Sequence, residues 1–256
     1  MQKFNPTNRF SDRVENYVKF RPAYPEEIYA YLRAEAGLGI DETIMDLGSG
    51  TGVLSKLFLN YGHKVFGVEP NSDMRKAGEH ILASKKKFVS LDGRAEEIPL
   101  PDQSIDFVVA GQAFHWFEPL DSRIEVKRVL VPDGEVALIW NEWDRKLSPF
   151  LEEYEALLLK FGTDFEKVRR NSNSEVSIRK FFNPIQPQFA QFPNRQDFDF
   201  EALRGRLLSS SYAPLEDHPD FKAMIDSLQE IFARHNKEGL VRFDYRTTIY
   251  HAKMNG

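Results

Sequence analysis

Short apolar runs alternate with amphipathic segments over the first half of the chain. Apolar runs bounded by polar or glycine positions predict buried strands, and helical spacing between them predicts helices. The predicted strands are 43–47, 64–70, 87–91, 104–110 and 135–141, and the predicted helices are 53–61, 73–82 and one that ends near residue 130. This alternation is typical of an α/β, doubly wound and mostly parallel sheet of Rossmann-like type, with ligands at the carboxyl ends of the strands.

The alternation is lost beyond Asn141. The remaining predictions are helices at 149–161, 201–208 and 219–236, a polar irregular segment at 171–187, a strand within 188–200 and a last strand at 240–252. Two strands from this half bring the sheet to seven. Before the first strand we expect two short helices, from Ser11 through Tyr17 towards Arg21 and from Pro25 to Ala36. The whole chain, 1–256, is predicted to be one domain with a helical lid (1–40), a core (41–147), a cap insertion (148–187) and the final strands and helices (188–256).

Composition narrows the class of protein. The 256 residues are 41% hydrophobic, which is enough for a proper core. Apolar runs long enough for a membrane span are absent, and the first ten residues lack the apolar segment of a secretory signal, so we expect a cytoplasmic protein without a membrane partner. The lack of cysteine excludes disulfides, thiolate metal sites and cysteine nucleophiles, and no metal is expected. A net charge of -5 argues against a nucleic-acid partner.

The stretch IMDLGSGTG, Ile44 to Gly52, places three glycines directly behind an apolar run. A predicted strand, a glycine turn and a predicted helix form the first half of a nucleotide-binding unit. A dinucleotide fingerprint would need a third small residue where Val53 stands, so NAD is the weaker interpretation. A glycine loop followed by Lys and Ser or Thr is also missing, which excludes a phosphate-binding P-loop of that type.

The stretch DLGSGTG resembles motif I of class I S-adenosyl-L-methionine-dependent methyltransferases. The resemblance continues through VFGVEPN, LDGRAEEIPLPDQSIDFVVAGQAFHWF and EVKRVLVPDGEVALIW, and it covers about Ile44 to Trp140. The AFHWF stretch and the N-terminal FSDRVENYVKFRPAYP are similar to methyltransferases of type 11, in the branch of small-molecule and trans-aconitate-like enzymes. The resemblance implies a Rossmann-like fold, an enzyme of class EC 2.1.1.- and S-adenosylmethionine as cofactor, with S-adenosylhomocysteine as product.

The resemblance also implies cofactor-binding positions. Asp46 would face the ammonium side of the methionine end, Glu69 would accept hydrogen bonds from the ribose hydroxyls, and the glycine loop would let the methionine end lie against the main chain. Related enzymes often carry Asp where this chain has Arg94, so adenine recognition is expected to rest on the main chain around Ala95. The full predicted set is Asp46, Gly48, Ser49, Gly50, Gly52, Glu69, Pro70, Arg94, Ala95 and Gln112, with Tyr17 and Arg21 from the lid.

The predicted acceptor side consists of His115 and Trp116, after the fourth strand, and Trp143, after the fifth. His115 is the candidate catalytic base, because it is the only histidine near the expected methyl site. A structural alternative stays open for each of two groups of residues. The His-Trp pair is then a packed aromatic corner without a role in the reaction. Likewise, Tyr17, Arg21 and Tyr24 then serve only to fasten the N-terminal helices.

The predicted activity is methyl transfer to an oxygen, such as that of a carboxylate, or to a nitrogen of a small molecule. One alternative is a methyltransferase acting on RNA or protein. The absence of an Asn-Pro-Pro-Tyr type sequence after the fourth strand argues against amino methylation of bases. A second alternative is a module that binds S-adenosylmethionine without catalysis.

Overall fold

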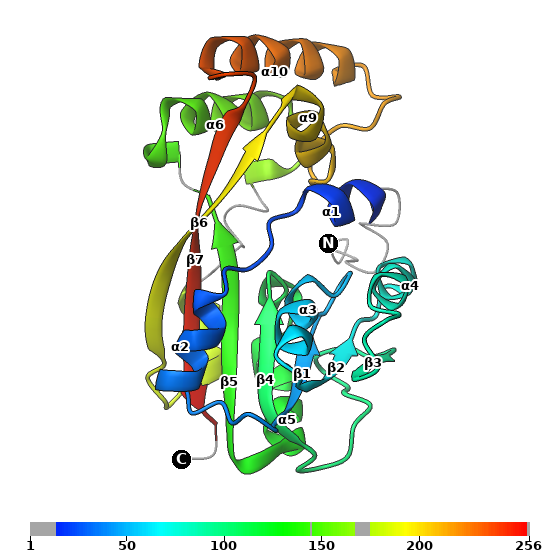
Figure 1. Cartoon of the computed structure of the whole chain (residues 1–256), viewed down its shortest axis with the longest axis vertical. Coiled ribbons are helices and arrows are strands. Elements are labelled where there is room, and N and C mark those ends of the chain that lie inside the picture. Colours follow the sequence, from blue (N-terminus) through cyan, green and yellow to red (C-terminus); the bar gives the residue numbers. More distant parts are fainter. Residues whose placement is uncertain (1–13, 144, 167–174, 255–256) are drawn as a thin grey trace.

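A computed structural model of the chain describes residues 14–143, 145–166 and 175–254. Its centre is a seven-stranded sheet of order β3-β2-β1-β4-β5-β7-β6 (Figure 1). The strands are β1 (Thr43–Leu47), β2 (Lys64–Val68), β3 (Phe88–Leu91), β4 (Ile105–Gly111), β5 (Leu130–Glu142), β6 (Gln188–Phe198) and β7 (Val241–Lys253). The first five pair in parallel, and β7 runs antiparallel to both β5 and β6. The predicted Rossmann-like, mostly parallel sheet of seven strands is confirmed.

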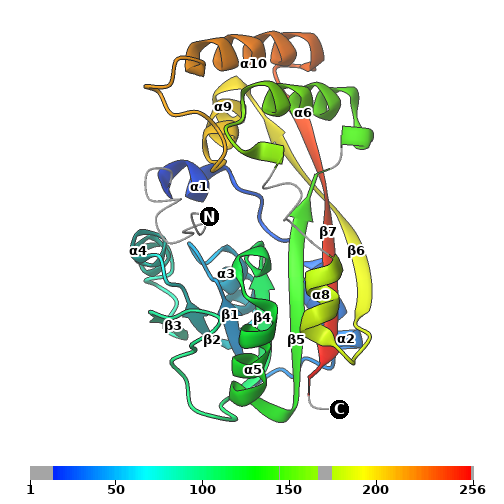
Figure 2. The same cartoon turned by 180° about the vertical axis from the view of Figure 1, so that it is seen from behind.

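Helices cover both faces of this sheet. On one face lie α2 (Glu27–Glu35) and α3 (Val53–Asn60), and on the other lie α5 (Pro119–Val129) and α8 (Glu175–Phe182) (Figures 1 and 2). A fifth helix, α4 (Ser72–Ile81), follows β2 and lies beside β3. Because both faces are covered, the central strands are apolar on both sides, which explains the continuous apolar runs of the sequence.

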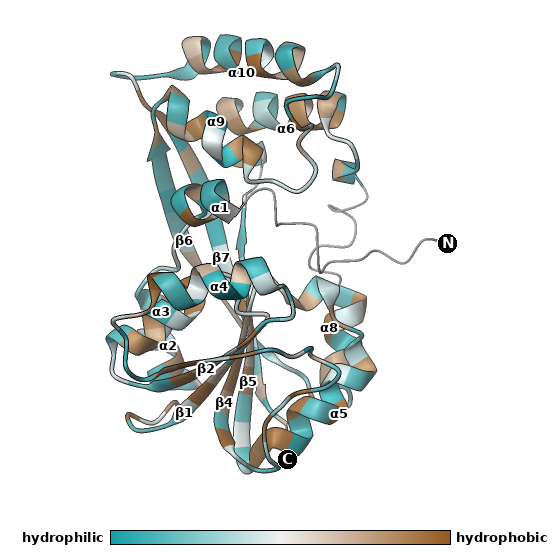
Figure 3. Ribbon diagram, turned by 90° about the vertical axis from the view of Figure 1, so that its right-hand side faces the viewer, coloured by the Kyte–Doolittle hydropathy of each residue, from teal (hydrophilic) through white to brown (hydrophobic). Residues whose placement is uncertain are grey.

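Alternate residues of β4 divide the core into two layers. Phe107 and Val109 pack with α2 and α3, whereas Val108 and Ala110 pack with α5 and α8. The alternation follows from the two-residue period of a strand. The strands of this core are accordingly the most hydrophobic part of the ribbon (Figure 3).

Three helices form a cap beyond the carboxyl ends of the parallel strands: α6 (Pro149–Phe161), α9 (Phe200–Leu208) and α10 (Phe221–His235). They pack on the outer end of the β6–β7 ribbon, where Val241, Phe243 and Tyr245 are buried on one side of β7, as their alternation predicts. Ser148 caps the start of α6, since its hydroxyl accepts a hydrogen bond from Leu151 N at 3.2 Å. We call these three helices and the ribbon residues 241–245 the cap.

The segment 14–24, which we call the lid segment, lies between the cap and the strand ends. Its helix α1 (Val14–Phe20) packs on α9, and all three ribbon views place it between the two parts (Figures 1, 2 and 3). Two side chains of β6 hold the segment. Gln196 Nε2 donates to Phe20 O at 3.4 Å, and Asn194 Nδ2 donates to Ala23 O at 2.8 Å.

One prediction of secondary structure is wrong. The segment 171–187 was predicted to be irregular, but it contains helix α8, whose Ile178, Phe181 and Phe182 are buried in the core. These three positions have the spacing of one helical face, within a segment that is otherwise polar. The structure therefore puts α8 on the sheet beside α5, whereas α6 lies in the cap.

The start of the first predicted helix, at Ser11, lies outside the described residues. The predicted division into lid, core, cap and final strands stays a prediction.

The helices of the described ranges are all too short or too polar to cross a lipid bilayer.

Candidate active site

The turn after β1 contains three glycines with different surroundings. Two of them pack closely against side chains, and the third has room beside its α-carbon. Gly48, Gly50 and Gly52 all have positive φ values, of 73°, 56° and 81°. A Cβ on Gly48 would lie 2.5 Å from Ala113 Cβ, and one on Gly52 would lie 2.5 Å from a methyl group of Leu82. Among the described residues, a Cβ on Gly50 would meet only the Met74 methyl group, at 3.4 Å. Gly50 is thus the position where a ligand can approach the main chain without a side chain in the way.

Glu69 follows the end of β2, and its carboxylate reaches the glycine turn. One oxygen, Oε2, accepts a hydrogen bond from Gly50 N at 2.9 Å, and the other, Oε1, accepts one from Asn71 N at 2.9 Å. Burial raises the pKa of Glu69, and these two hydrogen bonds act against that rise. Each carboxylate oxygen has a further lone pair, so Glu69 can still accept a hydrogen bond from a hydroxyl group of a ligand. Pro70 links Glu69 to Asn71, whose side chain caps α4.

Asp46 lies near the end of β1 and is buried. Its Oδ2 accepts a hydrogen bond from Ser55 Oγ at 2.7 Å, whereas its buried Oδ1 has no hydrogen-bond partner among the described residues. Burial raises the pKa of Asp46 to about 7, with a smaller contribution in the same direction from the charge of Glu69 and an opposing one from Ser55. An unsatisfied buried carboxylate oxygen costs free energy, which a cationic or hydrogen-bond-donating ligand group would recover.

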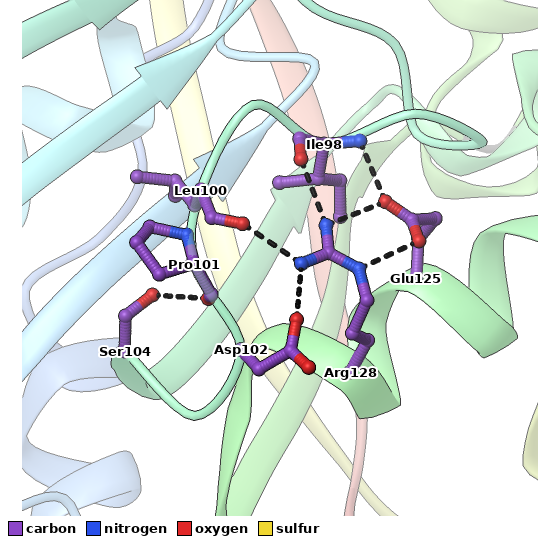
Figure 4. Close-up of polar contacts among 7 residues, drawn as sticks. All are labelled: Ile98, Leu100, Pro101, Asp102, Ser104, Glu125 and Arg128. Carbon is purple, nitrogen blue, oxygen red and sulfur yellow. Dashed lines mark hydrogen bonds and ion pairs between the residues drawn. The ribbon is translucent and has the colours of Figure 1, made fainter.

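The loop after β3 carries Arg94 and Ala95 next to the expected adenine side. Arg94 is exposed, and its backbone pairs with that of Glu97, whereas Ala95 is buried in the core. Further along, the loop is tied to α5 by Arg128. Its guanidinium donates to five oxygens at 2.8–2.9 Å, namely Ile98 O, Leu100 O, Asp102 Oδ1 and both oxygens of Glu125 (Figure 4). This arrangement fixes the loop that follows Ala95.

Gln112 stands directly after β4 with a positive φ of 53°. Its side-chain Oε1 accepts a hydrogen bond from Asn141 N at 2.9 Å, and the backbone N–H of Gln112 donates to Ile139 O at 2.9 Å. Gln112 therefore joins the ends of β4 and β5 through contacts that the sequence did not indicate. Its predicted role in cofactor binding stays a prediction.

His115 and Trp116 lie on the one-turn helix η3 (Phe114–Trp116), between β4 and α5. Their ring centroids are 4.7 Å apart, and both side chains are partly exposed. Phe114 is turned into the core instead, where it packs edge-on against Trp140 and Phe181. The aromatic stretch therefore divides into one residue buried in the core and two that are partly exposed after the end of β4.

Arg21 and Tyr24 extend the lid segment to the cap and to the end of β4, respectively. Arg21 Nη2 donates to Ser209 O, at the end of α9, at 3.0 Å. Tyr24 places its hydroxyl at the end of β4, only 2.5 Å from where a Cβ on Gly111 would lie. The side chain of Tyr17 lies outside the described part of the chain. Arg21 thus joins the lid segment to the cap, and its cofactor role stays a prediction.

Trp143 follows β5 and belongs to the aromatic cluster of the cap. Its ring lies 5.7 Å from that of Tyr154, 5.8 Å from that of Phe243 and 6.3 Å from that of Phe165. Among the described residues, no group of three or more His, Asp or Glu side chains is arranged to hold a metal ion.

The structure brings Asp46, Gly50 and Glu69 to one edge of the sheet, from three neighbouring segments. An unpartnered carboxylate oxygen, an open glycine and a second carboxylate with spare lone pairs suit the ammonium group, the methionine backbone and the ribose hydroxyls of S-adenosylmethionine. The residues present therefore fit the cofactor.

Comparisons with known proteins agree with this fit. Residues 45–138 match a family model described as a methyltransferase domain. An uncharacterized methyltransferase of Mycobacterium tuberculosis (strain ATCC 25618 / H37Rv) is 32% identical over 235 residues, which cover 90% of each chain. An uncharacterized methyltransferase of Schizosaccharomyces pombe is 30% identical over 250 residues, covering 94% of this chain and 95% of that protein.

Solved structures share the fold at lower identity. A candidate type II methyltransferase from Anaeromyxobacter dehalogenans superposes with a TM-score of 0.68 and 19% identity, over 92% of this chain and 98% of that one. The sequence relatives extend over nearly the whole chain and the fold agrees throughout. The chain therefore belongs to the class I S-adenosylmethionine-dependent methyltransferases.

Proposed function

We propose that this enzyme methylates an oxygen or nitrogen atom of a small molecule, and that it belongs to the small-molecule branch that its aromatic AFHWF stretch resembles. The observation that carries the proposal is that Asp46, Gly50 and Glu69 belong to the carboxyl ends of β1 and β2, and that the lid segment and the cap lie beyond the strand ends (Figure 1). A lid and a cap over the strand ends favour an enclosed small acceptor over a long RNA or a folded protein. The net charge of -5 supports the same choice against RNA.

The chain's own residues would hold the cofactor by three kinds of contact. Asp46 Oδ1 accepts from the ammonium group, Glu69 accepts from the ribose hydroxyls, and the bare main chain at Gly50 admits the methionine end. When bound, S-adenosylmethionine supplies an electrophilic methyl group on a positively charged sulfur.

Catalysis in this proposal rests mainly on alignment of the acceptor and on the exclusion of water by the lid segment and the cap. An alcohol or amine acceptor must lose a proton, and His115 is the group proposed to take it. A carboxylate acceptor is already ionised and needs no base, in which case His115 would orient it. Trp116, beside His115, offers an aromatic face that favours a cationic group.

The class of acceptor can be tested by product formation. The protein is incubated with S-adenosylmethionine and one of three additions: a low-molecular-weight metabolite extract, total RNA or a protein extract. We expect S-adenosylhomocysteine to form only with the metabolite extract. Formation with RNA or protein alone would reject the small-molecule proposal, and formation with none of them would favour a binding module without catalysis.

Replacing Glu69 by alanine should weaken S-adenosylhomocysteine binding by roughly 1.5–3 kcal/mol, the range for hydrogen bonds to a charged group. Calorimetric titration measures the change. Because Glu69 also accepts from Gly50 N and Asn71 N, a thermal melt should accompany it. Glu97→Ala, at an exposed carboxylate on the β3–β4 loop, is the matched control and should bind as the wild type does. Unchanged affinity in the Glu69 variant would remove its ribose role.

The pH dependence of S-adenosylhomocysteine binding should reveal the ionisation of the Asp46 carboxyl group. Its pKa in the folded protein is about 7, above the value of about 3.9 expected in the unfolded chain. The folded state therefore keeps a proton that the unfolded state loses, so Asp46 lowers the stability of the ligand-free protein as pH rises through this window. An ammonium ligand favours the ionised form, so binding should release this proton below about pH 7.

We therefore expect S-adenosylhomocysteine affinity to fall by up to about tenfold per pH unit as the pH is lowered from about 7 to about 5. Calorimetry across this range measures it. Glu69, whose pKa is also raised, adds a slope of the same sign. Asp46→Asn separates the two, because it should bind more weakly and with a shallower pH profile. An equally steep profile in Asp46→Asn would show that Asp46 does not face the ammonium group.

A further inference from the structure

The cap contains a buried arginine that has no acidic partner among residues 14–143, 145–166 and 175–254. Arg206, on α9, has 3% of its surface exposed. Its Nε donates to the Tyr245 hydroxyl at 3.2 Å, its Nη1 donates to Ser210 Oγ at 3.2 Å, and its guanidinium lies 5.4 Å from the ring centroid of Phe243. All three partners are neutral, and within the described ranges no carboxylate forms an ion pair with Arg206. Buried charges are normally paired, because removing them from water is costly.

A second buried polar group lies beside this arginine. The hydroxyl of Tyr154, on α6, has no hydrogen-bond partner in the described part of the chain, although the residue is only 1% exposed. Burial raises the pKa of Tyr154, so the hydroxyl is neutral and can donate a hydrogen bond. The positive charges of Arg206 and Arg21 both act on this hydroxyl. The ring of Tyr154 packs edge-on against that of Phe243, with centroids 5.2 Å apart, and the Arg206 guanidinium lies over the same Phe243 ring. The hydroxyl and the guanidinium therefore share one neighbour in the cap.

This region lies where the cap meets the lid segment. The ring of Phe20 packs so closely on Gly205 that a Cβ there would overlap it, and Arg21 donates to Ser209 O at 3.0 Å. Arg206 thus lies between Gly205 and Ser209, both of which the lid segment contacts. Figure 1 shows α9 directly above α1, on the side of the cap that faces the strand ends.

We propose that Arg206 and Tyr154 bind an oxyanion group, a carboxylate or a phosphate, of the methyl acceptor at this junction. The guanidinium has five N–H donors, and hydrogen bonds to Tyr245 and Ser210 use two of them. A carboxylate or phosphate matches the remaining fork, accepts from the Tyr154 hydroxyl and neutralises the buried charge. The inference rests on the proposed function, since it assigns the acceptor of that same reaction a negative charge remote from the methylated atom.

The test uses three probes on protein saturated with S-adenosylhomocysteine, at constant ionic strength: succinate, inorganic phosphate and the neutral succinamide. We expect succinate or phosphate to bind in calorimetry and raise the melting temperature, and succinamide to do neither. The anion that binds more tightly identifies the oxyanion. Arg206→Gln should raise the dissociation constant of that anion at least about tenfold, as expected for loss of a charged hydrogen-bonding partner.

Two further variants keep the test decisive. Arg204→Gln, on the same helix but 35% exposed and near Glu201 and Glu216, should bind the anion as the wild type does. Tyr154→Phe removes a hydroxyl that has no partner, so its melting temperature should not fall, while anion affinity should fall roughly tenfold. If Arg206→Gln does not fold, the anion affinity of Tyr154→Phe tests the inference in its place.

The inference is overturned if neither anion binds, or if the Arg206 and Tyr154 variants bind as tightly as the wild type. A failure of the wild type to bind S-adenosylhomocysteine would instead count against the proposed function. The anion titration of the ligand-free protein would then decide the inference by itself.

Discussion

Replacing Gly50 by valine is expected to abolish binding of S-adenosylmethionine and S-adenosylhomocysteine. At this position the backbone has a φ of 56°, and in the part of the chain that the structure describes the Met74 methyl group is the one neighbour within 4 Å of an added Cβ, the adjoining residues aside. The valine side chain would therefore occupy the space through which the methionine end approaches the main chain. Calorimetry should show no heat of binding at ligand concentrations that saturate the wild type.

The control for this substitution is Gly62→Val. Gly62 also has a positive φ, of 89°, and an added Cβ there meets nothing within 4 Å. It follows α3, away from the glycine turn, so it reproduces the backbone strain of roughly 1–2 kcal/mol without touching the site. Similar melting temperatures in the two variants, with binding lost only in Gly50→Val, would assign the loss to ligand contact. Full binding by Gly50→Val would exclude a close approach of the cofactor at this turn.

Replacing His115 by asparagine is expected to lower turnover about 10²–10⁴-fold if the histidine is a general base, with cofactor affinity nearly unchanged. The reason is that η3 places His115 after β4, at the carboxyl edge of the sheet, whereas the proposed cofactor contacts come from β1, the turn after it and the end of β2. If His115 only orients a carboxylate acceptor, the main effect should be a higher KM. Acceptor-dependent kinetics separates the two roles.

His80→Asn is the matched control, because His80 is exposed on α4. It should have wild-type kinetics and stability. A His115 variant that melts at a lower temperature but retains its activity per folded molecule would show that the histidine is structural. The catalytic assignment would then have to be abandoned.

Most of the sheet could be predicted from the sequence because its central strands are covered on both faces. Burial of both sides forces continuous apolar runs such as that of β4, and each run is followed by a helix with its own start and end signals. Helix α8 could not be recognised in the same way. Only three of its residues enter the core, and the flanking residues are polar.

The cofactor edge was predictable for a local reason. Asp46 and Gly50 belong to one short stretch, and Glu69 ends the next strand, so parallel pairing of β1 with β2 brings them together. The proposed oxyanion site was not predictable, because Tyr154, Arg206 and Tyr245 come from α6, α9 and β7 and meet only through tertiary packing. Nor does a sequence show that Arg206 is buried without a carboxylate partner among the described residues, although that is its distinguishing property.

The side-chain contacts of Gln112 and Trp143 depend on the same long-range packing. Gln112 accepts from Asn141 N across two strands, and Trp143 packs against Tyr154 and Phe243 of the cap. Neither contact is visible in the residues that flank these positions. Motif resemblance therefore predicts backbone positions at the strand ends, whereas the contacts of each side chain become visible only in the folded chain.

Calorimetric titration of the wild-type protein with S-adenosylhomocysteine and, separately, with NAD tests the cofactor assignment most directly. In the proposed function the glycine turn and Glu69 hold a ribose without a pyrophosphate. We therefore expect S-adenosylhomocysteine to bind with a dissociation constant on the order of micromolar, a binding free energy of about -8 kcal/mol, and NAD not to bind. Measurable NAD binding, without a response to S-adenosylhomocysteine, would contradict the assignment of Asp46, Gly50 and Glu69.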